Sequence, residues 1–172
     1  MDDRRPRGLT LPELLVTLAL VGVLVSAAVP ALQQQIRDAR LRGAAQAAAD
    51  ALHATRAEAI RRNRPLALAV CGSGPAAWCL SPCAADACDC GGGCASAGAV
   101  VPAVDAADYP GTELAEVRFG RSRAARFSPL RGLARAGHLL FRSPGGRSLA
   151  VVVSPLGRVR LCSDDFPGYP PC

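Results

Sequence analysis

The stretch from Leu14 to Val29 reads LLVTLALVGVLVSAAV, sixteen consecutive residues without a charge. The apolar character extends further, from Leu9 to Leu32, and Glu13 is the one charged residue within it. A helix of about 24 residues rises about 36 Å at 1.5 Å per residue, which is enough to cross a bilayer core of about 30 Å. The sequence therefore predicts one membrane-spanning helix.

The charges before this stretch predict its orientation. Positive residues on the N-terminal side of a span favour a cytoplasmic N-terminus, so everything after residue 32 is expected outside the cytoplasm. A secretory signal cut near Ala28 is the alternative, because small residues precede Pro30 there. Glu13 and the continuation of the helical pattern past Pro30 argue against that cut. The positive residues are Arg4, Arg5 and Arg7.

Glu13 is the unusual residue of the apolar stretch. An unpaired carboxylate in an apolar environment is costly, and such a residue usually has a partner or a function. The alternative is a carboxylate at the membrane interface that stays wetted by lipid headgroups.

The pattern from Ala31 to Asn63 is that of an amphipathic helix continuous with the span. Apolar residues recur near helical spacing, with Arg and Gln between them. Pro30 is expected to bend this helix and Pro65 to end it. His53 has no nucleophile or metal partner nearby in sequence and is interpreted as a packing residue.

After Pro65 the pattern changes to short strands separated by Pro and Gly. Turns are expected at 144–146 and 155–157. We expect an antiparallel sheet packed on the far half of the helix. Few large apolar residues occur between Gly72 and Pro110, so crosslinks are expected to define that segment as a loop. The predicted strands are 66–71, 114–119, 139–142, 148–154 and 158–162.

Eight cysteines all lie after residue 70, and their even number indicates disulfides in an oxidising compartment. The pairing is open, although Cys162 and Cys172 could close a short loop. No two cysteines have C-x-x-C spacing, so a zinc site is disfavoured, and no nearby histidine supports a catalytic cysteine. The disulfide candidates are Cys71, Cys79, Cys83, Cys88, Cys90, Cys94, Cys162 and Cys172.

The chain carries a net charge of +6, and all 20 of its basic residues are Arg. Residues 65–117 hold six acids and no Arg, whereas residues 118–162 hold ten Arg and no acid. Such a basic surface could bind DNA phosphates or pair with acidic faces of neighbouring subunits. The first candidates are Arg158 and Arg160, followed by Arg118, Arg121, Arg123 and Arg126.

Arg7-Gly8 followed by LTLPELLV resembles the class III signal of type IV prepilins and type II secretion pseudopilins. The resemblance implies that a prepilin peptidase cuts between Gly8 and Leu9 and that the amine of Leu9 is methylated. Glu13 then becomes the fifth mature residue, the position of the family's glutamate, where it would pair with the amine of a neighbouring subunit. The family usually begins its mature chain with Phe, and this chain has Leu9.

Two further segments resemble the GspH/FimT branch of that family. Residues 41–63 are similar to the end of its helix, and residues 151–162 (VVVSPLGRVRLC) are similar to its closing hairpin. The resemblance implies an α+β, type IV pilin-like fold with four parts. These are a leader peptide at 1–8, a filament-core helix at 9–32, its amphipathic continuation at 33–64 and a β-rich, disulfide-containing periplasmic head at 65–172.

Together these features predict a structural minor pseudopilin or minor pilin without enzymatic activity, cofactor or metal. Its expected partners are other pilins or pseudopilins, the prepilin peptidase and the bacterial inner membrane. Some FimT-like minor pilins bind DNA through a basic region near the closing hairpin, so the alternative is a DNA-binding subunit for DNA uptake. An anchored enzyme with a cysteine-metal site is a third, poorly supported possibility.

Overall fold

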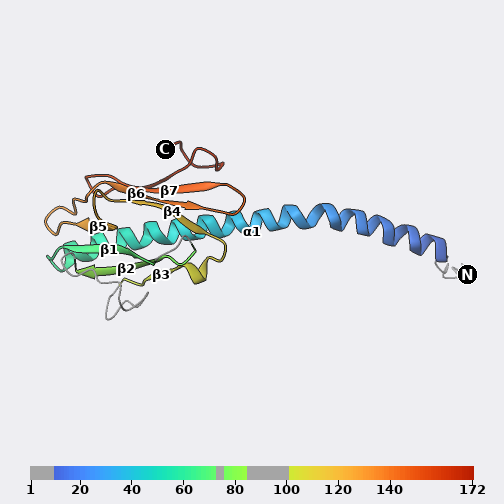
Figure 1. The fold of residues 1–172 in the computed structure, drawn as a ribbon, viewed down its shortest axis with the longest axis horizontal. Coiled ribbons are helices and arrows are strands. Elements are labelled where there is room, and N and C mark those ends of the chain that lie inside the picture. Colours follow the sequence, from blue (N-terminus) through green and yellow to red (C-terminus); the bar gives the residue numbers. More distant parts are fainter. Residues whose placement is uncertain (1–9, 73–75, 85–100) are drawn as a thin grey trace, which may run out of the picture. The chain divides into compact units, whose positions relative to one another are not determined.

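The computed structural model of the protein describes residues 10–72, 76–84 and 101–172. One long helix, α1 (Leu11–Arg61), precedes a series of short strands (Figure 1). The chain divides after Ile36 into two compact units. The strands are β1 (Leu66–Cys71), β2 (Cys79–Ala84), β3 (Val104–Asp105), β4 (Glu113–Arg118), β5 (Ala124–Phe127), β6 (Gly137–Arg142), β7 (Ser148–Val153) and β8 (Val159–Cys162), and a 3-10 turn, η1 (Ala106–Asp108), follows β3.

α1 changes character along its length. From Leu11 to Ile36 its side chains are exposed, whereas after Arg40 small residues are buried at every third or fourth position. Pro30 lies inside the helix, as expected for a continuous element. Small side chains let the neighbouring strands approach closely, so the second half of α1 forms one wall of the core. Its buried apolar residues are Leu41, Ala44, Ala45, Ala48, Ala49, Ala51, Leu52 and Ala59.

The end of α1 is held by a buried carboxylate. Glu58 accepts two hydrogen bonds from Arg61, at 2.6 and 2.7 Å, and another from Arg62. The hydrogen bonds from Arg61 outweigh the burial that opposes ionisation, and with Arg62 they lower the pKa of Glu58 from 4.5 to about 2. Asn63 then adopts a positive φ of 50°, which ends the helix in the left-handed conformation that Asn tolerates.

The strands form two antiparallel four-stranded sheets. Sheet A has the order β3-β2-β1-β5, and sheet B has the order β4-β6-β7-β8. Both expected turns are confirmed: Gly146 N–H donates to the carbonyl of Ser143 at 3.0 Å, and Gly157 N–H donates to the carbonyl of Ser154 at 2.9 Å. The α+β architecture expected from the sequence is therefore present, with two sheets sharing one core with α1.

Trp78 lies at the centre of that core. Its ring is 2% exposed and packs against Phe141 of β6 and Tyr109, with centroid separations of 5.2 and 6.3 Å. The indole N–H donates to the carbonyl of Thr112 at 3.0 Å, so burial leaves no unpaired donor. Trp78, directly before β2, thereby connects sheet A to sheet B.

Two expectations were wrong. The segment 72–110 is not only a crosslinked loop, because its described residues include β2, β3 and several buried side chains, among them Trp78, Leu80 and Val104. Those side chains come from separate places in the segment, so they form no periodic pattern. His53 is exposed and does not pack in the core; Thr55 and Glu58 occupy the buried face of α1 instead.

Candidate functional site

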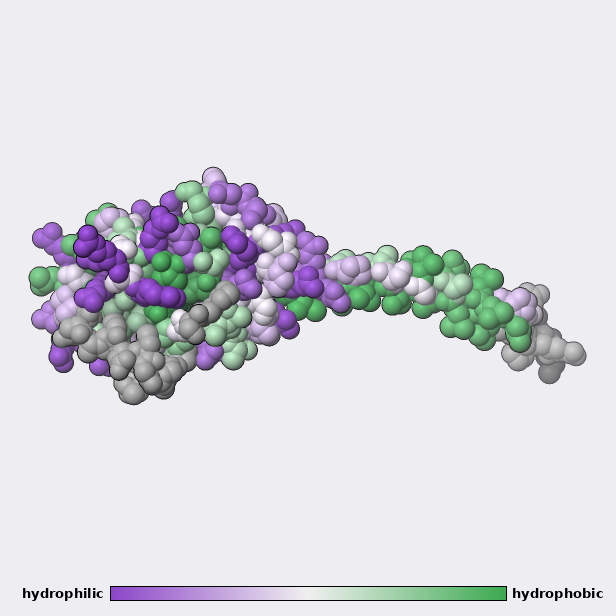
Figure 2. Space-filling view, viewed as in Figure 1, coloured by the Kyte–Doolittle hydropathy of each residue, from purple (hydrophilic) through white to green (hydrophobic). Residues whose placement is uncertain are grey.

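The first half of α1 presents an apolar surface that nothing in its own unit covers. Up to Ile36, hydrophobic colours dominate this part of the helix (Figure 2). The helix contains a segment long and apolar enough to cross a membrane. Aliphatic side chains that stay exposed over six or more helical turns require a lipid or protein environment. The exposed side chains include Leu11, Leu14, Leu15, Val16, Leu18, Leu20, Val21, Val23, Leu24, Val25, Val29, Leu32 and Ile36.

The hydroxyl groups of this segment bond to its own backbone. Thr17 Oγ1 donates to the carbonyl of Leu14 at 2.9 Å, and Ser26 Oγ donates to the carbonyl of Val23 at 2.7 Å. These bonds remove the need for a polar neighbour, which suits an apolar environment. Glu13, in the first turn of α1, differs: among the described residues no ion pair or hydrogen bond engages its carboxylate.

The predicted cleavage site at Gly8 and Leu9 lies outside the described residues. Its placement relative to Glu13 therefore remains a prediction from the sequence. The described part of the chain begins at Thr10, whose carbonyl accepts a hydrogen bond from Leu14 N–H at 3.1 Å, so helical bonding starts immediately before the first full turn.

The second candidate is the closing hairpin, β7–turn–β8. Ser154 N–H donates to the carbonyl of Arg158 at 2.9 Å, and Arg158 N–H donates to Ser154 Oγ at 3.2 Å. Gly157 occupies the turn with φ of 72°, a conformation that favours glycine. These bonds fix the backbone of Arg158, and its side chain is exposed beside the turn.

Arg56 ties α1 to this hairpin through two glycines. Its Nε donates to the carbonyl of Gly132 at 3.1 Å. A Cβ at Gly157 would lie 2.1 Å from that carbonyl oxygen and 2.8 Å from Arg56 Nε, so any side chain there would force the turn or Arg56 to move. The sequence analysis did not identify this role of Arg56, because the contact joins residues that lie 76 positions apart.

Two of the predicted arginines share one row across sheet B. Pairing places Arg118 of β4 opposite His138 of β6, His138 opposite Val152 of β7, and Val152 opposite Arg160 of β8. Residues directly opposite one another project from the same face of an antiparallel sheet. At about 4.8 Å per strand, Arg118 and Arg160 lie about 14 Å apart along this row.

Arg118 already has a partner within the chain. Its Nη2 lies 2.7 Å from Glu116 Oε1, and His138 Nε2 lies 3.5 Å from Glu116 Oε2. The hydrogen bond from His138 and the charge of Arg118 lower the pKa of Glu116. In the described part of the chain no ion pair neutralises Arg121, Arg123, Arg158 or Arg160, and all four are exposed. Arg121 and Arg123 lie on the connection between β4 and β5, where the chain passes from sheet B to sheet A.

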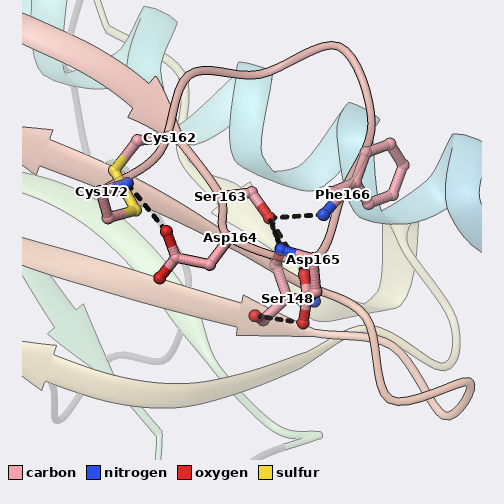
Figure 3. The surroundings of a disulfide bond; sticks show 7 residues. All are labelled: Ser148, Cys162, Ser163, Asp164, Asp165, Phe166 and Cys172. Carbon is pink, nitrogen blue, oxygen red and sulfur yellow. Dashed lines mark hydrogen bonds between the residues drawn. A yellow bond between two sulfur atoms is a disulfide. The ribbon is translucent and has the colours of Figure 1, made fainter.

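The same face of sheet B contains a hollow of about 450 Å³. Leu140, Ala150 and Val152 supply apolar lining, and His138 and Arg160 lie at one side. The loop closed by the Cys162–Cys172 disulfide borders it, and Asp164 of that loop accepts a hydrogen bond from Cys172 N–H at 3.1 Å (Figure 3). The expected C-terminal crosslink is thereby confirmed.

A second carboxylate anchors this loop to β7. Asp165 accepts hydrogen bonds from the N–H and hydroxyl of Ser148, at 2.9 and 3.0 Å, and from Ser163 Oγ at 3.0 Å (Figure 3). Burial opposes ionisation of Asp165, but these hydrogen bonds lower its pKa overall. The loop is therefore anchored by hydrogen bonds to the Asp165 carboxylate as well as by the disulfide.

The other cysteines divide into two groups. Cys71, Cys79 and Cys83 are disulfide-bonded, whereas Cys88, Cys90 and Cys94 lie outside the described residues. Across residues 10–72, 76–84 and 101–172, no group of three or more His, Cys, Asp or Glu side chains is arranged to hold a metal ion.

Comparison with known families gives two matches that do not overlap. The family profile described as type II transport protein GspH matches residues 44–157, more than half of the chain. The profile of the prokaryotic N-terminal methylation motif matches residues 3–29, which include Gly8 and Glu13. No curated protein and no solved structure matches the chain. The two profiles confirm the resemblance drawn from the sequence to the GspH/FimT family.

Proposed function

The chain belongs to the family of the type II transport protein GspH, and on that basis we propose that it is a minor pseudopilin or minor pilin, a subunit that assembles through its N-terminal helix. The family and the N-terminal methylation motif establish the coarser class, a type II secretion pseudopilin or type IV pilin. The apolar helix and the family indicate a single-pass subunit anchored in the inner membrane. The finer proposal is a non-catalytic role in filament assembly and protein secretion, with the N-terminus in the cytoplasm and the head in the periplasm.

The observation that carries the proposal is that the Glu13 carboxylate has no ion pair or hydrogen bond among the described residues. Its carboxylate lies in the first turn of a helix whose neighbouring side chains are exposed aliphatics. Such a carboxylate needs a counter-charge when the surface around it enters an apolar environment. Cleavage after Gly8 would create an amine on Leu9, four residues before Glu13, and that amine on a neighbouring subunit is the counter-charge we propose.

Processing and assembly can be tested separately. Substituting Gly8 by Val should leave the full-length precursor in the membrane when the prepilin peptidase is co-expressed, as measured by the mass of the purified chain. Glu13→Ala should still insert and be processed, but its recovery in sheared filaments should fall at least tenfold. Thr17→Ala in the same helix is the matched control, because Thr17 bonds only to its own backbone. Normal processing of the Gly8 variant would refute the class III signal.

A second candidate function, DNA binding, is favoured by one observation. Arg158 and Arg160 are exposed, lack ion-pair partners in the described part of the chain, and project beside an ordered turn. Phosphate contacts without base contacts give affinity that falls steeply with salt. The full chain in detergent should then shift double-stranded DNA at low salt, and Arg158→Gln/Arg160→Gln should weaken this binding at least fivefold. Binding that ignores salt or both substitutions would exclude this role for the hairpin.

A further inference from the structure

Exposed large apolar side chains gather at one end of the unit formed by residues 37–172. Four are exposed in the described part of that unit: Leu130, Leu156, Leu133 and Ile60. Leu130 is 85% exposed and Leu156 is 64% exposed. Contiguous exposed apolar side chains on a soluble unit mark an interaction surface. We name these four residues the leucine knob.

The three segments that carry the leucine knob are in contact. A Cβ at Gly132 would meet Ile60 Cδ1 at 2.9 Å, which places the β5–β6 loop against the end of α1. Ala134 N–H donates to the carbonyl of Pro155 at 3.0 Å, which joins that loop to the β7–β8 turn. The knob is therefore one surface on a rigid base.

Arginines surround the leucine knob. Arg131 and Arg158 adjoin it on the two turns, and Arg64 follows the helix end; all three are exposed. Glu58, the acid two residues before Ile60 on α1, is buried and already accepts hydrogen bonds from Arg61 and Arg62. The knob therefore carries uncompensated positive charge, and a complementary surface must combine carboxylates with an apolar recess.

Such a recess exists on the same chain. It has a volume of about 370 Å³ and lies between α1 and the residues before and after β3. Ala47, Ala51, Ala54 and Val104 contribute apolar lining, and the carboxylates of Asp50 and Asp108 lie on it. Both carboxylates act on Tyr109, because their charges add to burial in raising the pKa of its phenol. We name this surface the acidic recess.

We propose that the leucine knob of one copy docks into the acidic recess of a second copy, with Arg131 and Arg158 facing Asp50 and Asp108. Both halves of the interface occur once per chain, so the contact between the two copies is head-to-tail. A parallel copy displaced by nine residues along α1, about 14 Å at 1.5 Å per residue, brings Ile60 level with Ala51. This docking between two copies does not rest on the proposed function.

Site-specific photocrosslinking of the full chain in membranes tests this contact. One copy carries p-benzoylphenylalanine in place of Leu156 and one tag, and the co-expressed copy carries another tag. Irradiation should give a product containing both tags, and mass spectrometry should place the crosslink within residues 44–56 or 101–112 of the second copy. A crosslink to another protein, to lipid alone, or to a different surface of the second copy would overturn the proposal.

Charge reversal provides the specificity test. Arg131→Glu/Arg158→Glu in the photoreactive copy should reduce the product at least tenfold, and Asp50→Arg/Asp108→Arg in the second copy should restore it. Arg142→Glu is the matched control, because Arg142 is an exposed arginine at the opposite end of β6 and should have no effect. If Arg131→Glu/Arg158→Glu reduces the crosslinked product but Asp50→Arg/Asp108→Arg does not restore it, direct pairing of these arginines with these aspartates is contradicted.

The two proposals fail in different ways. If Gly8 and Glu13 substitutions leave processing and filament recovery unchanged while the crosslink forms as described, the filament proposal fails and the docking proposal stands. If processing and recovery depend on Gly8 and Glu13 while the crosslink ignores charge reversal, the docking proposal alone fails.

Discussion

At the scale of single residues, Gly157 and Gly132 show why the closing hairpin has the sequence it has. Both have positive φ, 72° and 59°, and both lie against Arg56. The backbone passes so close to the guanidinium that a single methyl group would displace either the turn or Arg56. Gly157 is therefore needed for a contact with α1 as well as for the turn.

Gly157→Ala should destabilise the unit of residues 37–172 by at least about 2 kcal/mol, because strain at positive φ adds to a steric clash. Thermal unfolding of the full chain in detergent measures the loss. Gly146→Ala is the matched control: Gly146 also has positive φ, 84°, but nothing lies within 4 Å of its added Cβ. Equal losses in both variants would show that the contact with Arg56 contributes little.

Glu58 predicts an acid dependence of stability. Its pKa is lowered to about 2 in the folded protein from 4.5, so its contribution is present in full above about pH 4.5 and is lost as pH falls towards 2. Glu58→Gln should therefore flatten the decline of the melting temperature between pH 5 and pH 2, because the variant has no carboxylate to protonate there. A decline as steep as that of the unchanged chain would assign the acid sensitivity to other carboxylates.

At the scale of elements, the sequence predicts the strands that are short, mostly apolar runs bounded by Pro and Gly. The expected strand 66–71 is β1 with the same bounds, and the expected strands of sheet B differ from the observed ones by one or two residues at their ends. The turns at 144–146 and 155–157, which contain Pro and Gly, separate β6, β7 and β8 in the sequence. β1 reads as an apolar run because both of its faces are buried: Leu68 and Val70 pack in the main core, and Ala67 and Ala69 pack in a second cluster.

β2 and β5 were not predicted, for physical reasons. β2 contains Pro82, which cannot donate to a sheet, and two cysteines, so its sequence CLSPCA lacks the usual strand residues. β5, with sequence AARF, owes its conformation to pairing with β1. Tertiary contacts decide both elements, and a single sequence does not show them. The hollow on sheet B was missed for the same reason, since its lining comes from three strands and the C-terminal loop.

The C-terminal loop combines a disulfide with an independent anchor, and each can be removed alone. Cys162→Ser/Cys172→Ser should lower the free energy of unfolding by about 2–3 kcal/mol, the entropy expected for a loop of this length. Asp165→Asn should destabilise the loop with the disulfide intact, because it removes the negative charge and replaces Oδ2, the acceptor for the Ser148 hydroxyl, by an NH2 donor. Urea unfolding of the oxidised variants in detergent distinguishes the two effects; no loss in either variant would contradict anchoring by this loop.

At the scale of the whole molecule, the chain has two units with different requirements. The unit up to Ile36 exposes aliphatic side chains, and its Thr17 and Ser26 hydroxyls bond to its own backbone, whereas the unit from Arg37 has a buried core of helix and sheets. The first depends on an apolar environment for its stability and the second on its own packing. The sequence predicts different parts, a span at 9–32, its amphipathic continuation at 33–64 and a head at 65–172.

The two units should therefore unfold separately in detergent. On heating, the near-ultraviolet circular dichroism of the head should be lost in one transition, while helical signal from about the first 26 residues of α1 remains at higher temperature, because micelles stabilise an apolar helix. Far-ultraviolet circular dichroism measures the helical signal that remains. Loss of both signals in one transition would show that the two units unfold cooperatively.

Trp78 is the only tryptophan in the chain, and it touches both Phe141 of sheet B and Tyr109 beside the acidic recess. Its fluorescence consequently reports on both the joint between the sheets and the neighbourhood of that recess, without any added label. An occupant that enters beside Tyr109 should change the quenching of this one indole, so the emission of the unmodified protein offers a direct optical titration of subunit docking.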